Sequence, residues 1–314
     1  MNVLPSLDVS DFAVPARFVA EIAAFCAAEQ GRANELLGVA VPFETEEGQA
    51  LLVEAIDTHW PELAELAALV RDMVALDPAF VVLRGLGYNR FAPLVRDTLV
   101  LALTRSIGKP TDHNLDKRVL WPVRPRGAQV SKIADYKTTF SEEAGEAPLH
   151  SDSAFALAPE KYNCLFVVRQ AADGGGVSVV LNGPRLVETL DKSADGRECL
   201  DILRRQQFPF RVPDAFFKGA RTITAPVLAE RPFVRFRYDC LMAGFALRDD
   251  LKSNERIWAI EHFRAAAESS VARVAHTLQP DEALIVDNHT MLHARSHFAD
   301  PDRHLIRVRM HAAA

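Results

Sequence analysis

A histidine and an aspartate stand two residues apart in Leu149-His150-Ser151-Asp152, after a polar loop and before an apolar stretch. On an extended segment, side chains alternate between the two faces, so His150 and Asp152 point the same way and can bind one metal ion. Because the chain has ten histidines, the chance that some aspartate follows one of them at this spacing is on the order of one in two. The pair alone is equally consistent with a hydrogen bond in a turn.

More histidines lie far downstream, at His289, His293 and His297. Two histidines and one carboxylate on a β scaffold form a facial triad, which leaves three positions of an octahedral ion open and is typical of non-haem iron(II) oxygenases. Zinc usually takes four tetrahedral ligands instead. All three histidines would face the same side of an extended strand, so their spacing does not choose among them. We favour His293 because it lies in the middle of the predicted strand.

Three arginines near the C-terminus are suited to binding an anion. Strand alternation places Arg303, Arg307 and Arg309 on one face. The opposite face is apolar and consists of Ile306, Val308 and Met310. Guanidinium groups are always charged and bind carboxylates with two parallel hydrogen bonds, so these arginines could anchor a dicarboxylic cosubstrate beside the metal. The alternative interpretation is a solvated edge strand whose charges discourage aggregation.

The run Asp173-Gly174-Gly175-Gly176-Val177-Ser178 predicts a tight hairpin that opens a strand. No Gly-Lys-Ser/Thr follows and no helix begins there, which excludes a phosphate-binding loop. The hydroxyl of Ser178 could share an anion with an arginine.

Helices are predicted in the first hundred residues, with a buried strand at Phe80–Gly85 between them. Apolar residues recur at helical spacing at Phe18, Ile22 and Phe25 before Gly31, at Leu63, Leu66, Val70 and Met73 after Pro61, and over Pro93–Ile107. A later helix is indicated by a stripe at Ile260, Phe263, Ala267, Val271, Val274 and Leu278.

Short strands are predicted from about Val119 onward, separated by Pro, Gly and Asp clusters. They cover Gln129–Ile133, Cys164–Val168, Val177–Leu181, Thr222–Ala225, Phe233–Tyr238, Ala283–Val286 and Leu305–Met310. This pattern predicts an α+β, mainly β fold with a jelly-roll (double-stranded β-helix) core. We expect a single domain over residues 1–314, with a helical layer and first strand in 1–115, the core in 116–314, and a helical insertion at about 252–278.

Composition limits the partners. The 36 basic and 42 acidic residues give a net charge of −6, the wrong sign for binding nucleic acid or anionic lipid. The four cysteines form no Cys-x-x-Cys pair, so we expect buried thiols. The sequence begins without a signal-like segment and contains no run of the roughly 20 apolar residues that a membrane span needs. We therefore expect a cytoplasmic protein without nucleic-acid or membrane partners.

Order and spacing of these motifs together resemble the iron(II)- and 2-oxoglutarate-dependent oxygenases of the taurine dioxygenase (TauD/TfdA) and clavaminate synthase-like family. The matching parts are Pro148 to Asp152, Gly175 to Ser178, Asp287 to Arg295, and Arg303 to Arg307, with weaker matches at Val82 to Gly85, Phe208 to Pro213 and Phe236 to Asp239. The chain departs from the family pattern at Ala294 and at Asp281, where glycine is common, and in the short span from His293 to Arg303.

The resemblance implies iron(II) bound by His150, Asp152 and His293. It also implies that Arg303, helped by Ser178, holds the distal carboxylate of 2-oxoglutarate, and that Arg307 assists it or contacts substrate. The short span before Arg303 leaves the roles of the two arginines open to exchange. The expected reaction uses O₂ and 2-oxoglutarate to hydroxylate an unactivated C–H bond of a small polar molecule. A catabolic sulfonate or amine dioxygenase is the alternative within the family, and a non-catalytic metal-binding sandwich module is the alternative outside it.

The substrate is expected to be an amino acid or an amino-acid derivative. A strand over Phe233–Asp239 would place Arg235, Arg237 and Asp239 on one face, and the resemblance puts that strand near the pocket. A guanidinium beside a carboxylate is complementary to a zwitterion. An ordinary surface ion pair would look the same in the sequence.

Overall fold

The computed structural model describes residues 4–35, 46–112, 118–125, 140–216 and 219–313. Its helices are α1 (Ala16–Glu35), α2 (Glu46–His59), α3 (Glu62–Ala75), α4 (Pro93–Ile107), α5 (Gly183–Leu190), α6 (Ala194–Arg205), α7 (Tyr238–Leu247) and α8 (Asn254–Ser269). Its strands are β1 (Ser6–Asp8), β2 (Phe80–Arg84), β3 (Gly108–Pro110), β4 (Trp121–Val123), β5 (Ala147–His150), β6 (Tyr162–Arg169), β7 (Ser178–Asn182), β8 (Phe208–Arg211), β9 (Thr222–Ala225), β10 (Val274–His276), β11 (Ala283–Asp287), β12 (Met291–Arg295) and β13 (His304–Ala312). This confirms the predicted mixture of helices and sheets.

Two sheets form the centre of the molecule. In the described residues, the large sheet has the order β1-β2-β11-β6-β13-β3, with β4 also paired to β13. The small sheet has the order β10-β7-β12-β5. Apart from the parallel pair β1 and β2, all pairings in both sheets are antiparallel. Apolar side chains pack between the sheets, including Phe80, Val167 and Leu284 of the large sheet and Val180 and Met291 of the small one.

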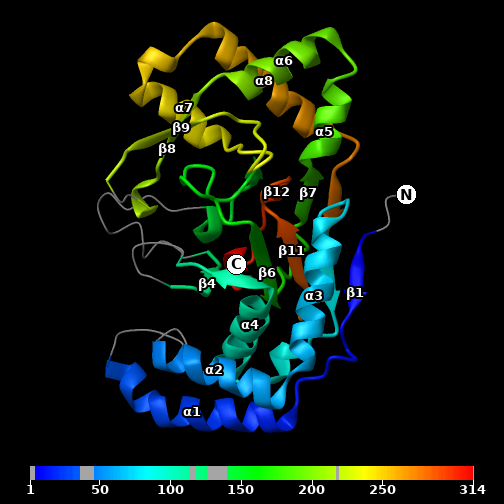
Figure 1. Cartoon of the computed structure of the whole chain (residues 1–314), viewed down its shortest axis with the longest axis vertical. Coiled ribbons are helices and arrows are strands. Elements are labelled where there is room, and N and C mark those ends of the chain that lie inside the picture. Colours follow the sequence, from blue (N-terminus) through cyan, green and yellow to red (C-terminus); the bar gives the residue numbers. More distant parts are fainter. Residues whose placement is uncertain (1–3, 36–45, 113–117, 126–139, 217–218, 314) are drawn as a thin grey trace.

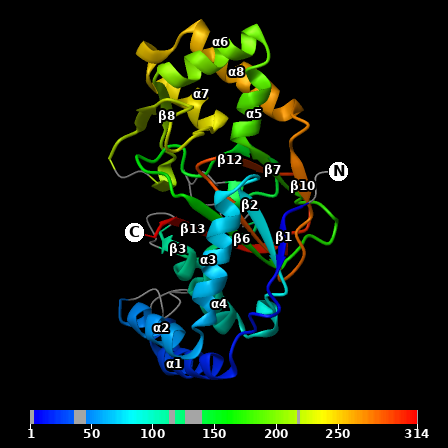
Figure 2. The ribbon, with the colours of Figure 1, turned by 45° about the vertical axis from the view of Figure 1, so that its right-hand side comes forward.

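Helices cover the outer face of each sheet, as Figures 1 and 2 show, with α1 and α2 at one end of the long axis and α6 to α8 at the other. The predicted alternation in β13 is confirmed: Ile306, Val308 and Met310 pack with α3 and α4 in one apolar core. Arg307 instead lines the pocket between the sheets. The outer face of the small sheet packs against α5 to α8 through Leu181 and Leu292.

The helical insertion differs from the prediction of a single helix at about 252–278. Helix α8 ends at Ser269, and Val274 begins β10. Buried Ile260, Phe263 and Ala267 are on the predicted stripe, but Val271 is 96% exposed. The helix ends where serine side chains compete for backbone hydrogen bonds, as when the Ser270 hydroxyl accepts from Ala272 N–H.

The insertion also contains helices α5, α6 and α7 and strand β8, which the sequence did not indicate, whereas β9 is the predicted strand Thr222–Ala225. Helices α5, α6 and α7 and the β8–β9 hairpin surround α8 in one apolar core, so the unit extends from 183 to 269. We call residues 183–269 the cap. The short helix α7 lies so close to β8 that a Cβ at Gly244 would stand 2.0 Å from the Pro209 carbonyl oxygen, which only glycine permits.

The predicted strand Phe233–Tyr238 is wrong. Its backbone N–H groups bond to separate segments: Val234 to His289, Arg235 to Val227, and Phe236 to the Ser151 hydroxyl. Residues 234–236 are all buried. The alternation of charged and apolar residues in the sequence therefore does not correspond to an exposed face and a buried face of a strand. The predicted strand Gln129–Ile133 lies outside the described residues.

Cys164, Cys199 and Cys240 are buried free thiols, as expected. Among the described residues, no helix is long and apolar enough to cross a membrane.

Candidate metal and anion site

The side chains of His150, Asp152 and His293 converge between the two sheets. One ligand atom from each lies within 4.8 Å of the others. The pairing of β12 with β5 sets His293 directly opposite His150, and the two ring centroids are 4.3 Å apart. Asp152 Oδ1 is 3.6 Å from His150 Nε2 and 3.9 Å from His293 Nε2. Three donors that converge without contacting one another closely leave room for an ion among them.

Backbone contacts orient these side chains. His150 Nδ1 is 2.7 Å from the Pro148 carbonyl oxygen, so Nδ1 carries the proton and the lone pair of Nε2 faces the site. Strand β5 ends at His150 and Asp152 lies in a turn, so the extended conformation assumed from the sequence stops short of the carboxylate. Asn288 fixes that turn, because its side chain accepts from Asp152 N–H at 2.7 Å and donates to the Asp152 carbonyl at 3.1 Å.

Charge at the site is set by burial and by Arg307. Burial alone would raise the pKa of Asp152, but Arg307, with Nη1 3.5 Å from Oδ2, holds that pKa well below its usual range. Burial and neighbouring His150 lower the pKa of His293 to about 3. A carboxylate with two neutral imidazoles is the ionisation state in which these groups bind a divalent cation.

The other two candidate histidines lie elsewhere. His289 Nε2 is 2.9 Å from the Pro159 carbonyl oxygen, and His297 is exposed. The geometry therefore brings together His150, Asp152 and His293 and leaves out His289 and His297.

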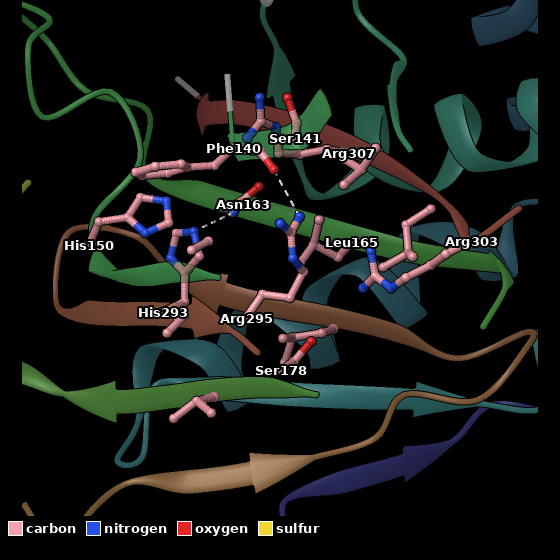
Figure 3. Close-up of a pocket in the computed structure, with 16 residues that line it drawn as sticks. Phe140, Ser141, His150, Asn163, Leu165, Ser178, His293, Arg295, Arg303 and Arg307 are labelled. Atoms are coloured by element: carbon pink, nitrogen blue, oxygen red, sulfur yellow. Dashed lines mark hydrogen bonds between the residues drawn. The ribbon is translucent and has the colours of Figure 1, made fainter. Parts of the chain in front are cut away.

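The same pocket contains a buried guanidinium at its other end. In Figure 3, His150 and His293 lie at one end and Arg303 at the other, with Arg295 and Ser178 between them. Arg303 is 2% exposed, and its Nε and Nη1 have no hydrogen-bond partner among the described residues. Its Nη2 donates to the Gly176 carbonyl at 3.4 Å. Burial and Arg295 lower the pKa of Arg303 to about 10, so the group stays charged at neutral pH and faces the pocket with unused donors.

The glycine turn makes space for Arg303. Gly174 and Gly176 adopt positive φ angles of 73° and 70°, and a Cβ at Gly176 would stand 2.5 Å from Arg303 Nε. Ser178 follows at the start of β7 and lines the same pocket. The strand predicted after the glycines is confirmed as β7, but the predicted hairpin is wrong, because β6 and β7 lie in different sheets and do not pair. The glycines instead let the backbone approach the Arg303 side chain closely.

Sequence reasoning missed Arg295, which stands two residues after His293. Its guanidinium donates to the carbonyl groups of Phe140, Glu143 and Gly145 at 2.6–2.9 Å. Those bonds hold Phe140 beside the His150 ring, at a centroid distance of 5.5 Å. The alternation of β12 places Arg295 on the same face as His293, which is the signal that could have identified it.

The two proposed substrate residues occupy different positions from those expected. Asp239 lies in the first turn of α7, not on a strand with Arg237. Arg237 Nε is 3.1 Å from Asp239 Oδ1, and these side chains are 11% and 50% exposed, respectively. The Arg237 guanidinium lies 4.6 Å from the Phe140 ring centroid and 5.7 Å from that of Phe155. Arg235, expected beside them, is buried and instead donates to the Ala154 and Ala156 carbonyls.

The chain is similar to known proteins over most of its length. Residues 44–309 match the family described as taurine catabolism dioxygenase TauD, TfdA family. No curated protein matches the chain. The solved structure of asparagine oxygenase in complex with Fe(II), 3-hydroxyasparagine and succinate is 18% identical, with a TM-score of 0.71, and the match covers 98% of this chain and 93% of that one. The structure of non-heme iron oxygenase OrfP with Fe and alpha-ketoglutaric acid is 15% identical, with a TM-score of 0.63, and the match covers 99% of this chain and 95% of that one. The structure of PvcB from Pseudomonas aeruginosa is 21% identical, with a TM-score of 0.52, and the match covers 80% of each chain.

At these identities the solved structures establish a shared fold. The family match spans most of the sequence and includes His150, Asp152, His293 and Arg303. This chain belongs to the TauD/TfdA family of dioxygenases.

Proposed function

We propose that this protein is an iron(II)- and 2-oxoglutarate-dependent dioxygenase that hydroxylates an unactivated C–H bond of an amino acid or amino-acid derivative. The observation that carries the proposal is one pocket with a His-Asp-His metal-binding group at one end and the buried, partly unpartnered Arg303 at the other. Iron(II) with 2-oxoglutarate supplies the activation of O₂, in which the oxoacid loses CO₂ and becomes succinate.

The metal-binding residues fit iron(II). Two imidazoles and one carboxylate are the donors of a facial triad, which leaves three positions for other ligands. The buried Asp152 Oδ2 and His293 Nδ1 have no hydrogen-bond partner among the described residues. These side chains therefore have atoms available for a bound ion or ligand. Asn288 and the Pro148 carbonyl hold the ligands in orientation.

The anion end fits a carboxylate. Arg303 Nε and Nη1 would bind the distal carboxylate of 2-oxoglutarate, and Ser178 would add a hydroxyl donor from the facing sheet. Arg307 would balance the charge of Asp152 and border the space where substrate binds, because its Nη1 lies 3.5 Å from that carboxylate.

The substrate class is supported by two observations. The similar structures hold 3-hydroxyasparagine in asparagine oxygenase and (3S)-hydroxy-L-Arg in OrfP. In this chain, Arg237 lies between Phe140 and Phe155 and pairs with Asp239. We assign Arg237 to the substrate carboxylate and Asp239 to the ion pair that positions Arg237.

The sheet topology supports a jelly-roll core for this function. Successive strands β10, β11, β12 and β13 alternate between the small and the large sheet. This alternation is expected when one chain winds around a double-stranded β-helix, and it places His293 and Arg303 on opposite sides of one pocket.

An anaerobic titration with iron(II) and 2-oxoglutarate tests the proposal. We expect a broad visible metal-to-ligand charge-transfer band, followed by succinate formation when O₂ and substrate are added. His150→Ala, Asp152→Ala and His293→Ala should each abolish succinate formation and leave the fold intact, whereas His289→Ala should retain it. Absence of the band at saturating iron and 2-oxoglutarate would favour the metal-binding module instead.

A further inference from the structure

A second cavity, of about 640 Å³, opens beside the metal-binding residues. Ser153, which directly follows Asp152, lines it, as does Arg309, two residues beyond Arg307 on β13. Pockets that bury drug-sized ligands have volumes of roughly 300–1,000 Å³. The cavity is therefore larger than a single small amino acid requires.

The lining of this cavity includes a buried carboxylate, Glu160, with one oxygen atom that has no hydrogen-bond partner among the described residues. The Glu160 side chain is 10% exposed. Its Oε1 accepts from the Thr111 hydroxyl at 3.0 Å, whereas its Oε2 has no hydrogen-bond partner among the described residues. Asn288, which orients Asp152, also donates to the Glu160 carbonyl at 2.9 Å. Glu160 and the metal ligand are thus positioned by the same amide.

The charge of Glu160 is already balanced within the protein. Arg309 Nε is 3.8 Å from Glu160 Oε1, and the Arg309 side chain is 4% exposed. Arg309 also donates to the Ser153 hydroxyl. A ligand that brings an ammonium group to Oε2 without adding net charge would satisfy the buried oxygen and keep the site neutral, and this describes the zwitterionic head of an amino acid.

Apolar side chains form another part of the lining. Phe155 and Phe216 pack with ring centroids 5.0 Å apart, and Val212 and Ile223, at the β8–β9 hairpin, also line the cavity. We infer that Glu160 binds the ammonium group of an amino-acid substrate whose apolar body fills this cavity. This inference rests on the proposed function and names the substrate class more narrowly.

Anaerobic calorimetry on the enzyme loaded with iron(II) and 2-oxoglutarate tests the inference. The probes are L-tryptophan and L-phenylalanine, each paired with its N-acetyl derivative, which lacks the ammonium charge. The wild type should bind each free amine at least tenfold more tightly than its acetylated partner. Glu160→Gln should remove this preference, and Glu160→Asp, which keeps the charge but retracts it, should reduce it. Glu188→Gln, at an exposed position on α5, should leave it unchanged.

The inference is overturned if neither free amine binds, or if Glu160→Gln and Glu160→Asp both keep the preference. It is also overturned if Asp239→Asn removes the preference while Glu160→Gln does not. The charge-transfer band separates these results from failure of the proposed function. With the band present and no amine preference, the dioxygenase assignment stands and Glu160 has no role in amine binding. Without the band, the dioxygenase assignment fails, and titrating the same probes into the metal-free protein still reports on Glu160.

Discussion

Arg303 and Arg307 have the same side chain but opposite electrostatic surroundings. Arg307 lies 3.5 Å from the Asp152 carboxylate, so its charge is largely used within the protein. Arg303 packs 4.8 Å from the Phe298 ring centroid and keeps two N–H groups without partners in the described part of the chain. Leaving a buried donor unpaired costs about 1–3 kcal/mol, which an incoming carboxylate recovers. This difference favours Arg303 over Arg307 as the 2-oxoglutarate anchor, a choice that spacing alone left open.

Arg303→Ala should weaken 2-oxoglutarate binding at least tenfold, because each hydrogen bond to a charged group contributes roughly 1.5–3 kcal/mol. Arg307→Ala should mainly raise the KM for substrate. Titration of 2-oxoglutarate into each variant, monitored by the charge-transfer band, measures the first effect. If Arg307→Ala weakens 2-oxoglutarate binding and Arg303→Ala does not, the two roles must be exchanged.

Gly176 offers a test that leaves every proposed ligand unchanged. Gly176→Ala combines a strained positive φ with a Cβ 2.5 Å from Arg303 Nε, so the guanidinium must move. Gly174→Ala has nearly the same φ, but nothing lies within 4 Å of its Cβ. Both variants should lose about 1 kcal/mol of stability from the backbone conformation. Only Gly176→Ala should raise the KM for 2-oxoglutarate, and equal KM values in the two variants would show that Arg303 does not depend on this turn.

The strands that hold the site could be predicted more fully than the cap that borders it. Strands β6, β7, β11 and β13 are apolar runs or clean alternations, because their surroundings are fixed by two packed sheets. Helix α7 has no comparable signal, since it is short and packs on β8 through Gly244, a residue that disfavours helices in isolation. Tertiary contact determines such an element. The cavity lining at Phe216 and Ile223 was not recognised from the sequence, although Ile223 lies in the predicted strand Thr222–Ala225.

The turn before β11 links three elements through one carboxylate. Glu282 accepts from Arg84 of β2 at 2.9 Å and from Gln279 N–H at 2.9 Å, and it lies 2.8 Å from His276 of β10. The neighbouring Asp281 adopts a φ of 68°, a backbone conformation that glycine adopts more readily than other residues. The Asp281 carboxylate also stabilises the turn, because it accepts a hydrogen bond from Asn89 N–H at 2.8 Å.

Glu282 should make stability depend on pH. Burial raises its pKa, but the bonds from Gln279, His276 and Arg84 outweigh burial and place the pKa below the ordinary value of 4.5. Its contribution should therefore be complete above about pH 4.5 and decrease as pH falls through the lowered folded-state pKa. Glu282→Gln should cost about 1–3 kcal/mol at pH 7 and less at pH 3.5, measured by urea unfolding. A difference that is independent of pH would mean that the charge of Glu282 contributes nothing.

In the described part of the chain, three apolar cores separate four layers of helices and sheets, and the proposed site lies between the two sheets that form the middle layers. One core binds α1 to α4 to the large sheet, another fills the space between the sheets, and the third binds the cap to the small sheet. The His-x-Asp pair, the distal histidine and the arginine tail were predictable because each lies in or beside a strand with a fixed side-chain direction. Their convergence could not be derived from spacing, since it depends on β12 pairing with β5 across more than 130 residues of sequence.

Ligand binding should therefore stabilise the whole protein through the contact between sheets. His150 and His293 belong to the small sheet, whereas Arg303 and Arg307 come from the last strand region of the large sheet. A metal ion bound alone would contact mainly the small-sheet side, but a metal ion with 2-oxoglutarate would connect both. A ligand that binds only the folded state adds RT ln(1 + [L]/Kd), or about 2.7 kcal/mol at a hundredfold excess over Kd.

Under anaerobic conditions, iron(II) and 2-oxoglutarate together should raise the Tm by more than the sum of their separate effects. Arg303→Ala should keep the shift caused by iron alone and lose the additional shift caused by 2-oxoglutarate. His293→Ala should lose both, because 2-oxoglutarate would then lack the metal that binds its oxoacid end. Strictly additive shifts in the wild type, measured by calorimetry over a range of ligand concentrations, would mean that the two ligands bind independently. They would then not share the pocket between the sheets, whatever the effects of the single substitutions on turnover.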